Sequence, residues 1–205
     1  GVHSGLMSDG MVELIERGAI TNARKPIDAG VSVAGLLAGG RRLLDFAHRN
    51  PALALRETAY THGQDILARL DRFTAINAAI EVDLTGQCCS ESIGHQQISG
   101  TGGQSDTATG AQMSKGGRSI IALYSTLEKV DRATGETQII SKIVPTLRPG
   151  AAVSLSRNDV HWVVTEYGAV NLRGCTVAER ATRLISIAHP DFRDELMAEA
   201  VRLGY

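Results

Sequence analysis

Residues 73–84, FTAINAAIEVDL, decide the fold that the sequence predicts. Apolar side chains lie on both alternating faces for most of this stretch, a pattern typical of a central strand covered by helices on each side. Residues 31–40, 118–126 and 161–172 are also rich in aliphatic side chains, and we expect a buried strand in each, the last ending near Gly168. Aromatic residues make up only 4% of the chain, which suits helices packed on a sheet better than an aromatic-rich sandwich. The sequence therefore predicts an α/β fold, with an open, mostly parallel sheet flanked by helices.

The segments between these strands carry helix and turn signals. Apolar spacing and capping residues predict five helices, at residues 8–20 (ending at Gly18), 41–48, 65–70, 176–188 and 190–203. In the last of these, Pro190 fits the first helical position and His189 the cap before it. Residues 129–147 have β-prone flanks around Thr134 and Gly135, so we expect an exposed hairpin there.

Composition excludes several classes of function. The net charge of the 205-residue chain is −1, which argues against nucleic acid or an anionic membrane surface as the main partner. No apolar run approaches the roughly 20 residues that span a bilayer, and the first residues lack a basic segment followed by a hydrophobic one, so we expect a soluble, cytoplasmic protein. Cys88, Cys89 and Cys175 are expected to be reduced thiols, and no spacing of histidines and cysteines predicts a metal site.

Residues 99–117, SGTGGQSDTATGAQMSKGG, contain six glycines and no hydrophobic side chain larger than Met113. Glycine loses more backbone entropy on folding than any other residue, so such a cluster is costly unless the backbone needs it. One interpretation is a flexible surface loop. The other is a loop whose bare N–H groups bind an anion or an oxyanion, placed after the carboxyl end of the strand at 73–84, where open α/β sheets bind ligands. Composition alone leaves both open.

Six stretches taken together resemble a known family. They are HSGLMSDGMVELIERGAIT, NAAIEVDLTGQ, ISGTGGQSD, SKGGRSIIAL, SRNDVHWVVTEYGAVNLRG and ISIAHPDFRDEL, at residues 3–21, 77–87, 98–106, 114–123, 156–174 and 185–196. They resemble the C-terminal half of the acetyl-CoA hydrolase/transferase family, which includes 4-hydroxybutyrate CoA-transferase. The resemblance implies that residues 1–205 form the family's C-terminal α/β domain, without its N-terminal half, in a homo-oligomeric enzyme that acts on an acyl-CoA and a small carboxylic acid.

The resemblance also implies a coenzyme A site. Ile80 matches a position that meets CoA through its main-chain amide, Gly103 one that contacts CoA, and Lys115 a lysine near the CoA, although Lys115 could equally be a solvated surface residue. The loop that would hold the thioester oxygen includes Gly100, Gly102 and Gln104. No metal is implied. Glu81 and Glu166 lie in matching motifs, and we interpret both as structural rather than catalytic.

One position departs from the family pattern. Family transferases use a glutamate as a covalent nucleophile, in a motif like GIHTEMVSDG. The matching stretch here is GVHSGLMSDG, which puts Gly5 at the glutamate's position. Asp9 and Glu13 are the nearest carboxylates that follow. Three hypotheses stay open: a CoA-transferase with its covalent step altered, an acyl-CoA hydrolase in which water replaces the glutamate, and a non-catalytic CoA-binding subunit.

Overall fold

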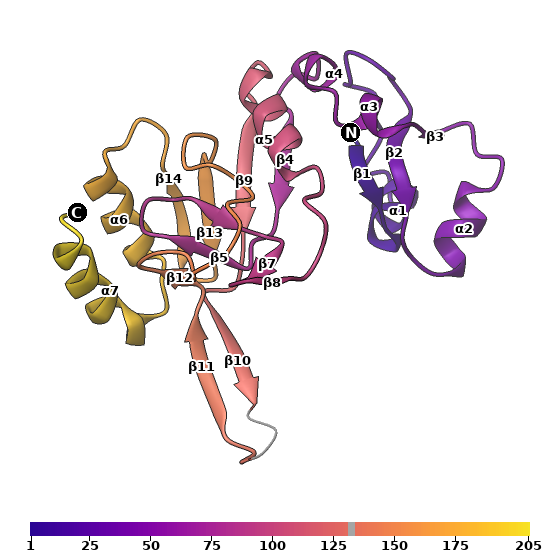
Figure 1. Cartoon of the computed structure of the whole chain (residues 1–205). Coiled ribbons are helices and arrows are strands. Elements are labelled where there is room, and N and C mark those ends of the chain that lie inside the picture. Colours follow the sequence, from indigo (N-terminus) through magenta and orange to yellow (C-terminus); the bar gives the residue numbers. More distant parts are fainter. Residues whose placement is uncertain (131–133) are drawn as a thin grey trace. The chain divides into compact units, whose positions relative to one another are not determined.

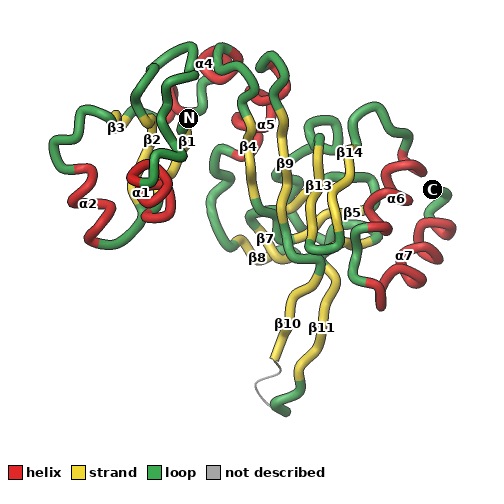
Figure 2. The backbone as a smooth tube through the Cα atoms, turned by 180° about the vertical axis from the view of Figure 1, so that it is seen from behind, coloured by secondary structure: helices red, strands yellow, loops and turns green. Residues whose placement is uncertain are grey.

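The computed structural model describes residues 1–130 and 134–205 and divides the chain into two compact units (Figure 1). Unit 1 comprises Gly1–Phe73 and Thr109–Gly117, and unit 2 comprises Thr74–Ala108 and Arg118–Tyr205. Both units combine helices with strands, which Figure 2 shows in red and yellow. The strand pairs of unit 1 are parallel, whereas unit 2 contains both parallel and antiparallel pairs. The predicted α/β class is confirmed, but the strands are divided among several small sheets instead of one open sheet.

Unit 1 contains a three-stranded parallel sheet of order β1-β2-β3, in which helices follow each strand. Its elements are β1 (His3–Met7), α1 (Asp9–Glu16), β2 (Ser32–Leu37), α2 (Arg41–Ala47), β3 (Leu53–Leu55), α3 (Thr58–Thr61) and α4 (Gln64–Ala68). The buried side chains of Met7, Val12, Ala34 and Leu43 form its core. The predicted helices at 8–20, 41–48 and 65–70 and the strand within 31–40 are confirmed, with shorter bounds.

Asp9 joins the first two helices of unit 1. Its carboxylate accepts hydrogen bonds from the main-chain N–H groups of Gly40 (2.7 Å) and Leu43 (3.1 Å) at the start of α2. The N-cap residue of α2 is a glycine, which has no side chain to satisfy these N–H groups. Asp9 therefore caps α2 from a position 31 residues earlier in the chain.

Unit 2 is built on a four-stranded sheet of order β14-β13-β9-β4, whose strands lie side by side in Figure 1. Strands β4 (Thr74–Asn77), β9 (Arg118–Ala122) and β13 (Trp162–Thr165) are parallel, and β14 (Gly168–Asn171) pairs with β13 in the antiparallel direction. The stretch 161–172, predicted as one strand ending near Gly168, is thus two strands joined by a tight turn. The φ of Gly168 is +145°, which lets the chain reverse there.

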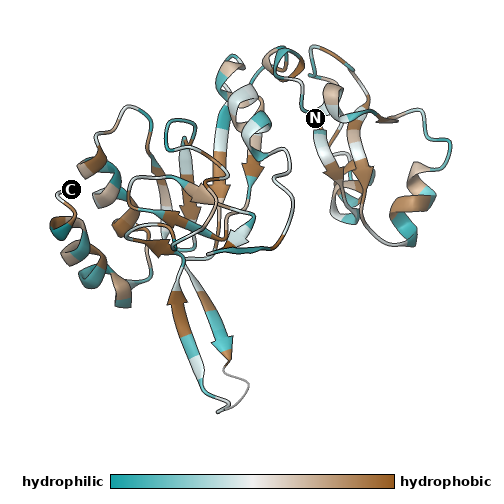
Figure 3. Ribbon diagram, viewed as in Figure 1, coloured by the Kyte–Doolittle hydropathy of each residue, from teal (hydrophilic) through white to brown (hydrophobic). Residues whose placement is uncertain are grey.

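Two helices, α6 (Val177–Ser186) and α7 (Pro190–Arg202), close unit 2 and pack against each other, with α6 also against β14. Hydrophobic and hydrophilic residues alternate along both helices in Figure 3. Thr176 and Glu179 form a capping box at the start of α6, and the His189 ring accepts a hydrogen bond from the Asp191 N–H at the start of α7. These two predicted helices are confirmed, including Pro190 at the first position and His189 as the cap.

The prediction of a single strand at residues 73–84 is wrong. Strand β4 ends at Asn77, and β5 (Glu81–Asp83) belongs to a second sheet of order β12-β5-β6, with β6 (Cys88–Cys89) and β12 (Ile143–Val144). A bend separates the strands, and the Ile80 N–H donates to the carbonyl of Cys89 across this second sheet. Both strands contribute side chains to the buried core. The pattern of hydrophobic residues therefore does not show that the chain leaves one sheet after β4 and enters another at β5.

The stretch 99–117 is also not a loop throughout, because residues Gln104–Met113 form helix α5. Several of its residues are small, and they permit close packing. A Cβ atom on Gly110 would lie 2.6 Å from side-chain atoms of Leu67, so only glycine allows this approach. The first glycines precede the helix, and Gly102 has a φ of +63°. Part of the glycine content therefore serves packing of a helix, while the residues before Gln104 form the loop and residues 114–117 form a turn after the helix.

Two hairpins complete unit 2. The predicted exposed hairpin is confirmed as β10 (Thr126–Val130) paired with β11 (Thr137–Ser141), which extends away from the sheets of unit 2 in Figure 1. It begins earlier than predicted, and residue Gly135 in its turn has a φ of +76°. A shorter hairpin is formed by β7 (Ser92–Ile93) and β8 (Gln96–Gln97).

Candidate active site

A cavity of about 460 Å³ lies in unit 2, where parallel strands β4, β9 and β13 end. Ligands of open α/β sheets bind outside the carboxyl ends of the strands, so this is the position in which the fold itself predicts a site. The walls are mostly aliphatic, with one ammonium and one carboxylate group. The lining residues are Ala78, Ala79, Ala122, Leu123, Tyr124, Lys142, Val164, Thr165 and Glu166.

Ser125 contacts both charged residues of this cavity, Glu166 through its carboxylate and Lys142 through its main chain. Its N–H and hydroxyl donate to the Glu166 carboxylate, at 2.9 Å and 2.6 Å, and its carbonyl accepts from the Lys142 N–H at 2.8 Å. Burial would raise the pKa of Glu166, but the hydrogen bonds from Ser125 outweigh it and lower the pKa. Glu166 thus links the turn after β13 to the segment after β9, and its structural rather than catalytic role stays a prediction.

The glycine loop reaches this cavity through Gln104. The Gln104 side-chain amide donates to the carbonyl of Ala78, a lining residue, at 3.2 Å. Asn77, at the end of β4, donates to the Thr107 hydroxyl of α5 at 3.2 Å. Within the described part of the chain, the main-chain N–H groups of residues 100–106 donate to no protein acceptor. The loop therefore presents a run of unsatisfied N–H groups at the N-terminus of a helix, an arrangement suited to an oxyanion or other anion.

Gly103 and Gly102 have different roles in this loop. Gly103 is half-buried, and its carbonyl accepts from both the N–H and the hydroxyl of Thr107 at 3.0 Å. The positive φ belongs to Gly102, which is exposed and has open space around it. The argument for glycine at Gly103 therefore depends on access for a ligand and not on backbone strain.

The main-chain amide of Ile80 is already used within the protein. It donates to the Cys89 carbonyl at 2.8 Å, as one of the hydrogen bonds beside the second sheet. The N–H of Ile80 thus pairs within the protein, and the contact of Ile80 with CoA stays a prediction. Ile80 directly follows two residues that line the cavity, Ala78 and Ala79, so its place in the chain is still beside the candidate site.

Gly5 lies on β1 of unit 1, under the ring of His62. A Cβ atom built on Gly5 would lie 2.6 Å from Cε1 and 2.8 Å from Nε2 of that ring. Contacts under about 3 Å require the neighbour to move, and the ring is the mobile end of its side chain. The Thr61 hydroxyl forms a hydrogen bond of 2.9 Å with the other ring nitrogen, Nδ1, which the ring would lose if it moved away. His62 thus occupies the space that a side chain at residue 5 would enter.

The two carboxylates that follow Gly5 in the sequence are both occupied. Asp9 caps α2, and Glu13 forms an ion pair of 2.6 Å with Arg17 on the same helix. Lys115, also in unit 1, is exposed, and its carbonyl accepts from the Arg72 N–H at 2.8 Å. Its contact with CoA stays a prediction.

Comparison with known proteins identifies the family. The profile of the acetyl-CoA hydrolase/transferase C-terminal domain matches residues 39–200. The chain belongs to the acetyl-CoA hydrolase/transferase family. It is 46% identical over 204 residues to a succinyl-CoA:cyclohexane-1-carboxylate CoA transferase of Geobacter metallireducens, covering 100% of this chain and 45% of that protein. It is 46% identical over 199 residues to the 4-hydroxybutyrate coenzyme A transferase of Clostridium kluyveri, covering 97% of this chain and 44% of that protein.

A solved structure of the same fold is RipA from Yersinia pestis. It is 42% identical to this chain, with a TM-score of 0.89 over 100% of this chain and 44% of RipA. The chain thus spans less than half the length of the relatives that it matches. The resemblance seen in the sequence motifs is confirmed, and so is the match to the C-terminal part of the family.

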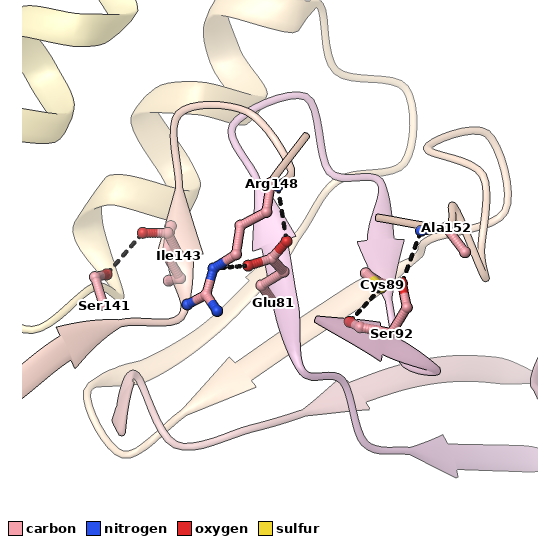
Figure 4. A network of polar contacts seen from close by, with 7 residues as sticks. All are labelled: Glu81, Cys89, Ser92, Ser141, Ile143, Arg148 and Ala152. Atoms are coloured by element: carbon pink, nitrogen blue, oxygen red, sulfur yellow. Dashed lines mark hydrogen bonds and ion pairs between the residues drawn. The ribbon is translucent and has the colours of Figure 1, made fainter. Parts of the chain in front are cut away.

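In this acetyl-CoA hydrolase/transferase domain, Glu81 is a buried structural residue (Figure 4). Its Oε1 accepts from the Arg148 N–H at 2.9 Å, and its Oε2 lies 3.1 Å from Arg148 Nε, without the alignment of a hydrogen bond. The Glu81 side chain is 2% exposed and that of Arg148 is 38% exposed. Cys89 and Ser92 form a neighbouring contact in the same view. The structural interpretation of Glu81 is confirmed.

We expect Arg148→Met to destabilise unit 2, because it removes the cation beside a buried carboxylate. The cost should be about 2 kcal/mol, below the roughly 3–5 kcal/mol for a fully buried pair, since Arg148 is partly in solvent. Urea unfolding followed by the fluorescence of Trp162, the single tryptophan and part of β13, measures it. Adding Glu81→Gln should recover part of the loss, because a neutral amide still accepts the main-chain N–H. A stability equal to wild type for Arg148→Met would contradict this role.

Sequence reasoning missed Lys142 and Ser125 at the cavity of unit 2, and it missed His62 beside Gly5 in unit 1. Each acquires its role from a partner far away in the sequence, and none belongs to a recognisable short motif. Cys88, Cys89 and Cys175 are free thiols, as predicted, and burial raises the pKa of Cys88. In the described ranges we find no cluster of three or more potential metal ligands, and no helix there is long and apolar enough to span a membrane.

Proposed function

We propose that this chain is the CoA-binding C-terminal part of a CoA-transferase that moves CoA between an acyl-CoA and a small carboxylic acid. The observation that carries the proposal is the run of unsatisfied N–H groups at residues 100–106, joined by Gln104 to a cavity at the carboxyl ends of three parallel strands. Such N–H groups stabilise the oxygen of a thioester that is under attack. The names of the relatives, which are CoA transferases for several acids, support the same reaction class.

The first assay follows the fate of CoA. The complete protein, in which this chain is joined to the half that its relatives carry before it, is mixed with an acyl-CoA and an acceptor acid. Transfer predicts acceptor-CoA as the product. Free CoA without acceptor-CoA would favour the second candidate, an acyl-CoA hydrolase, which Gly5 makes worth testing because it offers no carboxylate at the family's nucleophile position. Unchanged acyl-CoA would favour a non-catalytic subunit.

We expect the 205-residue chain by itself to bind CoA weakly or not at all, because the family resemblance implies a CoA site shared between two halves and this chain matches only one of them. Calorimetric titration of CoA into the chain, and into the complete protein, measures the difference. Tight binding by the chain alone would contradict a shared site.

We propose that Gly103 and Lys115 contact CoA and that Ile80 lies beside it, next to Ala78 and Ala79 of the cavity wall. The loop that holds the thioester oxygen would comprise Gly100, Gly102 and Gln104. The exposed ammonium of Lys115 is suited to a phosphate group. The free state of all three thiols is compatible with a reducing compartment, and we propose a cytoplasmic location. That the complete protein forms a homo-oligomer stays a prediction.

Lys115→Ala should weaken CoA binding to the complete protein by about 1–3 kcal/mol, the range for a hydrogen bond to a charged group. If Lys115 meets the 3′-phosphate, dephospho-CoA should bind wild type and variant with nearly equal affinity. Calorimetry with both ligands measures the gap. If Lys115→Ala weakens the binding of CoA and of dephospho-CoA equally, Lys115 does not contact the 3′-phosphate. If the variant loses no affinity for either ligand, Lys115 is a solvated surface residue.

A further inference from the structure

Among the residues that the structure describes, none accepts a hydrogen bond from the ammonium group of Lys142. Lys142 lies between β11 and β12, half-buried, and its side chain lines the cavity. Across residues 1–130 and 134–205, its Nζ atom forms no hydrogen bond and no ion pair. The Nζ atom is not among the buried polar atoms that lack a partner, so the three donors of the ammonium face the open cavity, where a ligand can reach them. Burial lowers the pKa of Lys142, and the charge of Glu166 opposes this shift.

The position of Lys142 is fixed on both sides by its main chain. Its N–H donates to Ser125 at 2.8 Å, and its carbonyl accepts from the Val82 N–H at 2.9 Å. Glu166, the one carboxylate of the cavity wall, is engaged by the N–H and hydroxyl of Ser125. Glu166 therefore helps to keep Lys142 charged without neutralising it by direct contact.

The rest of the wall is suited to hydrocarbon. Ala78, Ala79, Ala122, Leu123 and Val164 present aliphatic groups around a volume of about 460 Å³. Pockets of a few hundred Å³ with apolar walls and one or two fixed polar groups are typical of small-molecule sites, in which the polar groups set orientation. One unpaired cation in such a cavity selects a ligand with an anionic head and an apolar body.

We propose that this cavity binds the small carboxylic acid, with Lys142 paired to the carboxylate and the aliphatic walls around the hydrocarbon chain. The proposal rests on the proposed function and deepens it by assigning the residue that recognises the acid. No comparison made above assigns Lys142 a role. The site lies within unit 2, so the chain itself is sufficient for the test.

The test is titration of sodium butyrate into the 205-residue chain, by calorimetry and by amide chemical shifts of Ala79 and Leu123. We expect saturable binding to the wild type. Lys142→Met should weaken it about 10- to 100-fold, which is the size of a charge-assisted hydrogen bond. Lys142→Arg should retain most of the affinity. Lys129→Met, which removes an exposed lysine of β10, is the matched control and should bind like wild type.

Two further probes separate the possible ligands. Butyramide has the same chain without the charge, and we expect it to bind far more weakly than butyrate. Inorganic phosphate tests for a general anion site. Equal binding of butyramide, phosphate binding as tight as that of butyrate, equal loss in Lys129→Met, or no binding of butyrate would each overturn the proposal. Far-ultraviolet circular dichroism and Trp162 fluorescence verify that the Lys142 variants are folded; if Lys142→Met is not, Lys142→Gln replaces it in the comparison.

The acid site and the proposed transferase function can fail independently of each other in these experiments. Butyrate binding that depends on Lys142, together with no CoA transfer by the complete protein, would retain the acid site and reject the transferase. Transfer by the complete protein with an unchanged KM for the acid in Lys142→Met would retain the transferase and reject the acid site.

Discussion

Gly103→Val will abolish CoA binding to the complete protein while leaving the fold of unit 2 intact. Gly103 immediately precedes α5, and its neighbours present the unsatisfied N–H groups of the loop. A branched side chain there covers the approach to these groups. Because Gly103 is not among the residues with positive φ, valine meets no backbone strain at this position. Calorimetry with CoA, and Trp162 fluorescence for the fold, measure the two parts of the result.

Two other variants make this prediction specific. Gly103→Ala adds a single methyl group and should reduce affinity less than valine does. Gly10→Val places the same side chain on exposed α1, where an added Cβ meets no atom within 4 Å, and should bind CoA like wild type. Unchanged affinity for Gly103→Val would remove the loop from the CoA site. Loss of the folded fluorescence signal would mean that Gly103 is needed for structure.

Gly5→Glu, combined with His62→Ala, will give the complete protein a covalent intermediate that the wild type lacks. The new carboxylate attacks the thioester carbonyl of an acyl-CoA, forming an acyl-glutamyl anhydride and releasing the CoA thiolate. The thiolate then attacks the glutamyl carbonyl, which gives a glutamyl-CoA thioester and releases the carboxylate of the acid. Gly5→Glu alone should form less of it, because the His62 ring must first leave the space of the new side chain.

Intact mass after incubation with acyl-CoA detects this thioester, and borohydride then reduces the labelled glutamate to an alcohol. The isosteric control Gly5→Gln with His62→Ala has no nucleophilic carboxylate and should stay unlabelled. A label in the wild type on Asp9, Glu13 or Glu81 would show that the nucleophile has moved and that our interpretation of Gly5 is wrong. An unlabelled Gly5→Glu/His62→Ala protein that still binds acyl-CoA would remove residue 5 from the reacting position.

The parts of the fold that were predictable are those in which local pattern and packing agree. Helices α6 and α7 have caps and a buried face that the sequence displays directly, and β2 is a short aliphatic run between turns. Helix α5 was not predictable in the same way, because its small and polar residues give no marked apolar stripe. The division of 73–84 into two strands depends on the partner of Ile80, and local hydrophobicity does not encode that partner.

In the candidate site, too, some features were visible in the local sequence and others depend on contacts between distant residues. The glycine loop and the family resemblance were visible in contiguous motifs. The contact of Gly5 with His62 joins residues far apart in the sequence, and so does the hydrogen bonding of Ser125 to Glu166. Lys142 follows an ordinary strand, and only the cavity around it distinguishes it from a surface lysine. Long-range geometry, and not residue type, identifies these groups.

The imidazole above Gly5 also constrains the order of mutations by which evolution could place a glutamate there. If residue 5 changes first, the new side chain meets the His62 ring, which is hydrogen-bonded to Thr61, and the protein carries a steric conflict before it gains any chemistry. If residue 62 becomes small first, the path is open but the first step brings no benefit of its own. Neither single step supplies the reaction together with the space for it, so we expect a glutamate at residue 5 to occur together with a smaller side chain at residue 62.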